Sequence, residues 1–174
     1  MQFLTRTEAA ELAKAIAPEG GQGYSLVTAY PGLQVAFEDL PAYRLFNVAE
    51  RLIDLVDYFD WCLLWVTQTE VWGGTENLHL YYTVRRAYGE RTEIDQRPAQ
   101  RFLRHELRDL VTFVQLGMLN GWDMVLLSSH DYGRVFVSHD GWAEVVHPNG
   151  TSLEPAKEQF VSAKLECRTL RPAS

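Results

Sequence analysis

The chain lacks the features that mark a membrane or secreted protein. It has no apolar run near the roughly eighteen residues that a membrane span needs. Its first residues, MQFLTRTEAAEL, lack the basic head and apolar core of a signal peptide. Its two cysteines, Cys62 and Cys167, are far apart and form no CxxC, so they do not indicate a zinc site. We therefore expect a cytoplasmic protein with two free thiols.

A basic cluster is also missing, which argues against a nucleic-acid partner. The net charge is −7, and residues 1–60 carry nine Asp and Glu but only four Lys and Arg. Neutralisation of phosphates by Lys and Arg supplies much of the affinity for nucleic acids, and this chain offers little of it. An acidic surface is better suited to a basic protein partner.

Common catalytic motifs are absent as well. There is no GxSxG, P-loop or GxGxxG, and the residue four positions after His105 is Asp109, so there is no HExxH. The run Ser138-His139-Asp140 does not indicate a triad, because triads are assembled across a fold. We expect no cofactor and no metal site, and His130 and His139 should not share a metal. The enzymatic alternative is a metal-dependent or acid–base hydrolase that uses residues drawn from one set: His105, Glu106, His130, His139 and Asp140.

What the chain does have is clear periodicity. With 174 residues and 47% hydrophobic content, it suits one domain over residues 1–174. The patterns predict an α+β fold with a mainly antiparallel sheet and helices packed on it. The expected strands are an N-terminal hairpin (24–30 with 33–37), a central strand (61–67) covered on both faces, and a three-stranded meander (122–128, 134–138 and 142–146).

Five helices are expected around this sheet. Thr5 and Glu8 fit a capping box that opens the first, which runs to Ile16. The longest expected helix begins near Phe102 and ends at Asn120-Gly121, where the glycine suits a left-handed C-terminal position. The others are expected at 42–59, 76–88 and 153–166. A polar, exposed loop is expected at 90–100, and the tail 168–174 should fray.

Two charged residues break the apolar faces of their expected helices. Arg85 falls within the apolar arc of 76–88, and Glu106 within that of the helix that begins near Phe102. A charge on an apolar face must be paired, hydrogen-bonded or neutralised. We predict that these two side chains pair with each other, which is a structural role; a functional acid or base at Glu106 is the alternative.

The candidate binding residues are acidic or aromatic. Glu50, Asp54 and Asp57 form one column on the helix 42–59, opposite its apolar stripe. This column is either an ordinary solvated face or a surface for a basic partner. Trp72 and Trp142 lie on or beside expected strands, where tryptophan either fills a core or anchors an interface. The preferred interpretation is a non-enzymatic protein-binding module whose expected partner is a basic protein.

Four aromatic-rich segments stand out along the chain, namely WCLLWV, LYYTVRRAYG, WDMVLL and SHDGW. In these segments and in composition it resembles small acidic α+β proteins of bacteria, some of which are immunity proteins that neutralise toxins. That resemblance implies a protein-binding function. None of the segments is a motif specific to immunity proteins, so the resemblance assigns no residue a role.

Overall fold

The computed structural model describes residues 1–19, 23–56, 59–69 and 76–170. Within these ranges, eight antiparallel strands form one sheet in the order β1-β4-β3-β5-β6-β7-β2-β8. In chain order they are β1 (Gln2–Leu4), β2 (Gly32–Ala36), β3 (Trp61–Gln68), β4 (Ala99–Leu103), β5 (Asp123–Ser128), β6 (Arg134–Ser138), β7 (Trp142–Val146) and β8 (Cys167–Leu170).

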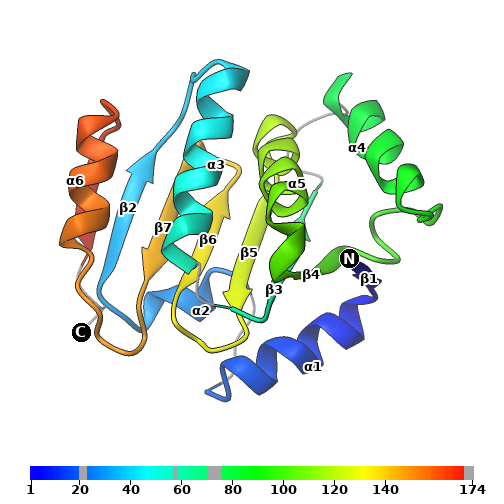
Figure 1. The fold of residues 1–174 in the computed structure, drawn as a ribbon, viewed down its shortest axis with the longest axis horizontal. Coiled ribbons are helices and arrows are strands. Elements are labelled where there is room, and N and C mark those ends of the chain that lie inside the picture. Colours follow the sequence, from blue (N-terminus) through cyan, green and yellow to red (C-terminus); the bar gives the residue numbers. More distant parts are fainter. Residues whose placement is uncertain (20–22, 57–58, 70–75, 171–174) are drawn as a thin grey trace.

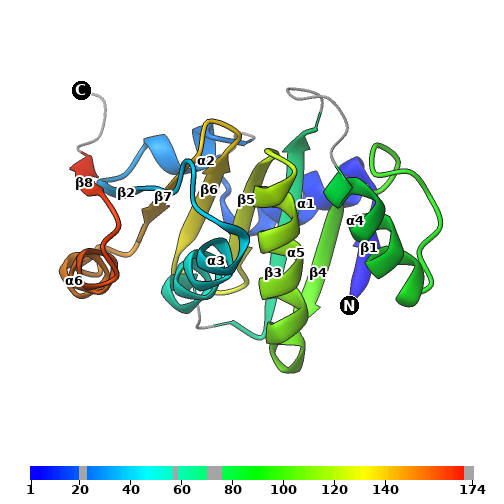
Figure 2. The same ribbon diagram turned by 90° about the horizontal axis from the view of Figure 1, so that it is seen from above.

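Helices cover both faces of this sheet (Figures 1 and 2). On one face lie α3 (Ala42–Val56), α4 (Glu76–Ala87), α5 (Leu107–Leu119) and α6 (Glu154–Ser162), and on the other lie α1 (Arg6–Ile16) and α2 (Ser25–Thr28). A short 3₁₀ turn, η1 (Arg104–Glu106), joins β4 to α5. No helix in the described part of the chain has both the length and the apolar character needed to cross a bilayer.

The central strand β3 divides the core in two. Cys62, Leu64 and Val66 point into the core under α3 and α5, whereas Leu63 and Trp65 point into the core under α1 and α2. Because successive side chains of a strand face opposite ways, an unbroken apolar run needs cover on both sides. The expected central strand, covered on both faces, is confirmed.

The predicted α+β class and the three-stranded meander are confirmed. So is the first cap: the side chain of Thr5 accepts a hydrogen bond from the backbone N–H of Glu8, and Glu8 accepts one from that of Thr5. At the end of α5, Gly121 has the predicted positive φ of 63°. Gly117 also matters in this helix, because a Cβ there would overlap the side chain of Met124 on β5.

Four expectations about local structure are wrong. Residues 25–28 form helix α2, not the first strand of a hairpin, and β2 pairs with β7 and β8 instead. Phe102 lies in strand β4, so the long helix begins only at Leu107. Residues 168–170 do not fray but belong to β8 and pair with β2. The helix expected at 42–59 does not reach its expected end, because Phe59 is not helical. Residues 57–58 and the tail beyond Leu170 lie outside the described residues.

The segment 90–100 also differs from the expected exposed loop. Glu90 and Ile94 are buried, and the segment ends inside β4. The carboxylate of Glu90 accepts hydrogen bonds from the backbone and hydroxyl of Thr92 and forms an ion pair of 3.1 Å with Arg97. These contacts close the loop on itself and place its carbonyl groups beside α4.

Those carbonyl groups are the partners of Arg85. Its guanidinium, fully buried, donates to the carbonyl oxygens of Arg97 (3.1 Å) and Thr92 (3.3 Å) and to the hydroxyl of Tyr81 (3.2 Å). The ring of Phe3 lies 4.9 Å from the guanidinium carbon, at cation–π distance. The predicted burial of Arg85 is therefore confirmed, but the partners of its charge are dipoles and rings, and its Nε has no hydrogen-bond partner among the described residues.

Glu106 has other partners, so its predicted pairing with Arg85 is wrong. It precedes α5 instead of lying on its apolar face, and its carboxylate accepts from the backbone N–H of Leu103 (2.8 Å) and pairs with the amino group of Met1. Burial opposes ionisation here, but these two donors outweigh it and lower the pKa of Glu106. The reason for the error is the helix boundary: residue 106 has no place on a helical face that begins at Leu107.

These contacts predict how the two residues behave in a double-mutant test. Arg85→Met removes a buried guanidinium that donates to the part-buried carbonyl groups of Arg97 and Thr92, which should cost about 2–4 kcal/mol of unfolding free energy. If Arg85 and Glu106 were a buried pair, adding Glu106→Gln would recover part of that loss. We expect no recovery: chemical denaturation should find the double variant at least as unstable as Arg85→Met alone.

A second prediction concerns the loop that supplies the carbonyl groups. Burial raises the pKa of Glu90, but the Thr92 hydrogen bonds and Arg97 outweigh burial and lower it to about 2. An acid with a lowered folded-state pKa stabilises the fold above its usual value of 4.5, and this contribution disappears as the pH falls toward 2. Over this pH range, the unfolding free energy measured by chemical denaturation should fall less in Glu90→Gln than in the wild type. The prediction is wrong if the unfolding free energy of Glu90→Gln falls with pH as steeply as that of the wild type. It is also wrong if the control Glu158→Gln, on α6, shows the same reduced fall.

Candidate functional site

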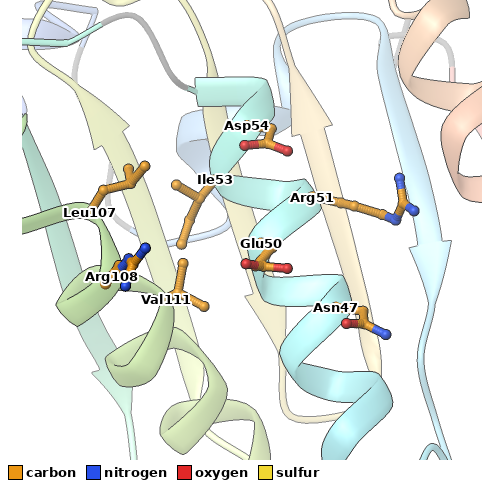
Figure 3. A pocket seen from close by; sticks show the side chains of 8 residues that line it. All are labelled: Asn47, Glu50, Arg51, Ile53, Asp54, Leu107, Arg108 and Val111. Carbon is orange, nitrogen blue, oxygen red and sulfur yellow. The ribbon is translucent and has the colours of Figure 1, made fainter.

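A groove lies between helices α3 and α5, on the face of the sheet that they cover (Figure 3). Its volume is about 490 Å³. Helix α3 contributes one wall and the first turns of α5 the other. The lining residues are Asn47, Glu50, Arg51, Ile53 and Asp54 from α3, and Leu107, Arg108 and Val111 from α5.

The acidic column stands on the α3 wall of this groove. Glu50 and Asp54 are both exposed, as their positions opposite the buried Leu52 and Val56 predicted. About one turn of helix separates them, and Figure 3 shows their carboxylates following each other along α3. The third member of the predicted column, Asp57, and the predicted binding residue Trp72 lie outside the described residues.

The base of the groove is apolar. Ile53 and Val111 are buried and face each other between the helices (Figure 3). Arg108 stands on the α5 side, whereas Arg51 extends away from α5. The groove therefore has an acidic wall, an apolar base and the Arg108 cation opposite the acids, which suits an apolar segment that carries positive charges toward α3.

The predicted catalytic residues fall into two groups at opposite ends of the sheet. Trp61 pairs with Leu103 at the end where β3 begins, so His105 and Glu106, which follow β4, lie there. His130, in the turn after β5, is at the same end, with its Nε2 3.3 Å from Asp60 Oδ2. His139 and Asp140 follow β6 and lie at the other end. The five residues therefore do not form one site.

At that other end, His139 is held between two carboxylates. Asp123 Oδ1 lies 2.8 Å from His139 Nδ1 and accepts the His139 backbone N–H at 2.8 Å. The other ring nitrogen, Nε2, is 3.3 Å from Asp140 Oδ1. A carboxylate on one ring nitrogen fixes the orientation of an imidazole. Sequence analysis missed Asp123, which only the β3–β5–β6 register brings to this position.

A pocket of about 560 Å³ opens beside this histidine. It lies between the β6–β7 turn, the loop that leads into α3, and the end of α5, and His139 and Asp140 line it together with Glu38 and Asp39. Over the described ranges, no three His, Cys, Asp or Glu side chains are placed to hold a metal ion. The pocket thus gathers acidic groups around one oriented imidazole.

Trp142, the remaining predicted binding residue, belongs to an aromatic cluster on the α1–α2 face. Its ring is 5.4 Å from that of Tyr24 and 5.6 Å from that of Phe136, and the Tyr24 and Phe136 rings are 5.0 Å apart. The Tyr24 hydroxyl donates to the buried Glu144 at 2.7 Å. Burial and this hydrogen bond raise the pKa of Tyr24 to about 12, and burial raises that of Glu144. This contact could not be predicted while residues 24–30 were assigned to a strand, because Tyr24 in fact lies at the beginning of helix α2.

Comparison of the chain with protein-family models, with curated proteins and with solved structures finds no match.

Proposed function

We propose that this chain is a non-enzymatic binding protein of the cytoplasm whose α3–α5 groove engages a basic segment of a protein partner. The observation that carries the proposal is the exposure of Glu50 and Asp54 along one wall of a groove with an apolar base. Nucleic acid is not the proposed partner, because the chain carries a net charge of −7.

The geometry of the groove supports a helical or extended segment. Two ridges with an apolar floor between them accept the apolar side chains of such a segment, while its lysines or arginines reach the carboxylates of α3. Rim charges contribute mainly to association rate and specificity, and the apolar floor contributes to lifetime. A basic toxin domain neutralised by an immunity protein is one partner with this chemistry, in line with the resemblance of the sequence.

Charge reversal on the acidic wall tests this proposal. In Glu50→Lys/Asp54→Lys, the α3 wall turns positive and should repel a basic segment. Affinity capture from the native host, read by quantitative mass spectrometry, should then yield a protein that the wild type retains and this variant loses. Calorimetry with the purified captured protein should then show that its affinity for the wild type decreases as the salt concentration rises, because salt screens exposed charges.

The matched control is Glu154→Lys/Glu158→Lys, which reverses two exposed carboxylates at the same spacing on α6. It makes the same change in net charge away from the groove, so it should retain the captured protein. The proposal fails if no captured protein depends on Glu50 and Asp54. It also fails if the α6 control loses the protein to the same extent, since net charge alone would then explain the binding.

A second candidate function is general acid–base catalysis by His139. The observation that favours it is the contact of 2.8 Å between Asp123 Oδ1 and His139 Nδ1, which orients the ring in a pocket of about 560 Å³. An imidazole oriented by a carboxylate is a common general base. This candidate uses one end of the sheet only and leaves His105, Glu106 and His130 without a catalytic role.

A panel of ester and amide substrates tests this second candidate. Any hydrolysis by the wild type should be lost in His139→Ala and retained in His130→Ala, which removes a histidine from a turn at the opposite end. Asp123→Asn should lower the rate without abolishing it, because it weakens the orientation of the ring. Equal activity in the wild type and His139→Ala would eliminate the candidate.

A further inference from the structure

The outer side of α3 continues beyond the groove toward the beginning of that helix. Two residues seven apart in an α-helix lie on the same face, about 10 Å from each other along the axis. Tyr43 is seven residues before Glu50, which stands on the acidic wall of the groove (Figure 3). Phe46 is seven residues before Ile53, which lies at its base. The wall therefore continues into a tyrosine and the base into a phenylalanine.

Both aromatic side chains are exposed to solvent. Tyr43 is 70% exposed and Phe46 is 39% exposed. Their neighbours Leu45 and Val48, by contrast, are buried in the core. Single exposed apolar residues are common, but adjoining exposed rings on one helix face are typical of interaction surfaces. The outer side of α3 thus has an aromatic half, followed by the acidic half that lines the groove.

This surface has a defined length. At the aromatic end, Gln115 on α5 donates a hydrogen bond of 2.9 Å to the carbonyl oxygen of Ala42, the first residue of α3. At the acidic end, Arg108 lines the groove together with Asp54. Tyr43 and Asp54 are eleven residues apart, which corresponds to about 16 Å, or three turns of helix. An occupant that contacts both halves must span that distance.

The walls favour a helical occupant over an extended one. Both walls are α-helices, whose backbone N–H and C=O groups are bonded within each helix, so they offer few partners to an extended chain. An extended chain on the apolar base would leave some of its own backbone groups unpaired, whereas a helix bonds them internally. The anchors of an amphipathic helix also recur seven residues apart, as Phe46 and Ile53 do.

We infer that this surface binds an amphipathic helix of about three turns with two different halves, an extension of the proposed function on which it rests. Apolar side chains of one half lie on Tyr43 and Phe46. Lysines or arginines of the other half reach Glu50 and Asp54, while their aliphatic stems cover Ile53. A helix that is basic along its whole length fits less well, because α3 has no carboxylate before Glu50.

Two synthetic helical peptides of identical composition test this arrangement. The clustered peptide carries leucines along one half of its binding side and lysines along the other, and the dispersed peptide alternates the same residues. Calorimetry at low salt should find the clustered peptide bound about tenfold more tightly. Amide chemical shifts in ¹⁵N-labelled protein should place it on α3 and on the first turns of α5. Equal affinities, or shifts confined to other elements, would overturn the inference.

A third peptide tests the helical conformation. It is the clustered peptide with a proline at its centre, on the side away from the groove, and proline cannot continue a helix. This peptide should bind about tenfold or more weakly than the clustered one. An extended binding mode would tolerate the proline, so retained affinity would show that the helical assignment is wrong.

Variants of α3 assign the aromatic half. Tyr43→Ser/Phe46→Ser should weaken the clustered peptide about tenfold. Tyr43→Ser alone changes only the more exposed ring, so it leaves the core intact, and it should weaken binding about threefold. The matched control is Leu80→Ser/Val161→Ser, which removes two exposed apolar side chains from α4 and α6 and should leave the affinity unchanged.

Charge reversal separates this inference from the proposed function. Glu50→Lys/Asp54→Lys should weaken both the clustered and the dispersed peptide, because both are basic. If it does so while Tyr43→Ser/Phe46→Ser binds the clustered peptide as tightly as its control, the two-half arrangement is wrong and the proposed function is unaffected. If charge reversal weakens neither peptide, the groove does not bind basic segments, and both are wrong.

Discussion

The burial of β3 on both faces is the constraint on which the rest of this structure depends. An eight-residue strand whose side chains alternate between two cores cannot be stable with helices on one face alone. The chain meets this requirement with two groups of helices from different parts of the sequence. Helices α1 and α2 precede β3 and cover one face, while α4 and α5 follow it and join α3 and α6 on the other. The candidate sites lie where this cover is incomplete, between neighbouring helices and at the strand ends.

Features set by local periodicity could be predicted from the sequence, because neighbours in the chain determine them. The capping box at Thr5 and Glu8 and the exposed side of α3 are of this kind. The strand β4 is different: its partners are β1, about a hundred residues earlier, and β3. Leu103 lies four residues before Leu107, a spacing that also suits a helix, so periodicity alone favours the wrong assignment. Short apolar runs such as 24–30 carry the same ambiguity.

The candidate sites follow the same division. Glu50 and Asp54 could be predicted because a helix fixes which of its residues face outward. The contact between Asp123 and His139 could not, since it depends on the register of three strands and on the turn after β6. Arg85 is an intermediate case. Its burial followed from its helix, but its partners are carbonyl groups of a loop, and any residue type supplies a carbonyl. Residue types therefore cannot reveal a carbonyl partner, whereas they do reveal a carboxylate, and this led the sequence-based prediction to choose Glu106.

Asp123 connects the two faces of the sheet at its first position on β5. Its side chain lines a small pocket beside Tyr24, Trp65 and Phe136 on the α1–α2 face, and its Oδ1 contacts His139, which lines the pocket near the end of α5. One carboxylate thus serves both faces, because the β3–β5–β6 register brings the turn after β6 against the first residue of β5. Substitution of Asp123 would therefore alter both pockets at once, whereas Trp65 lines the first and His139 the second.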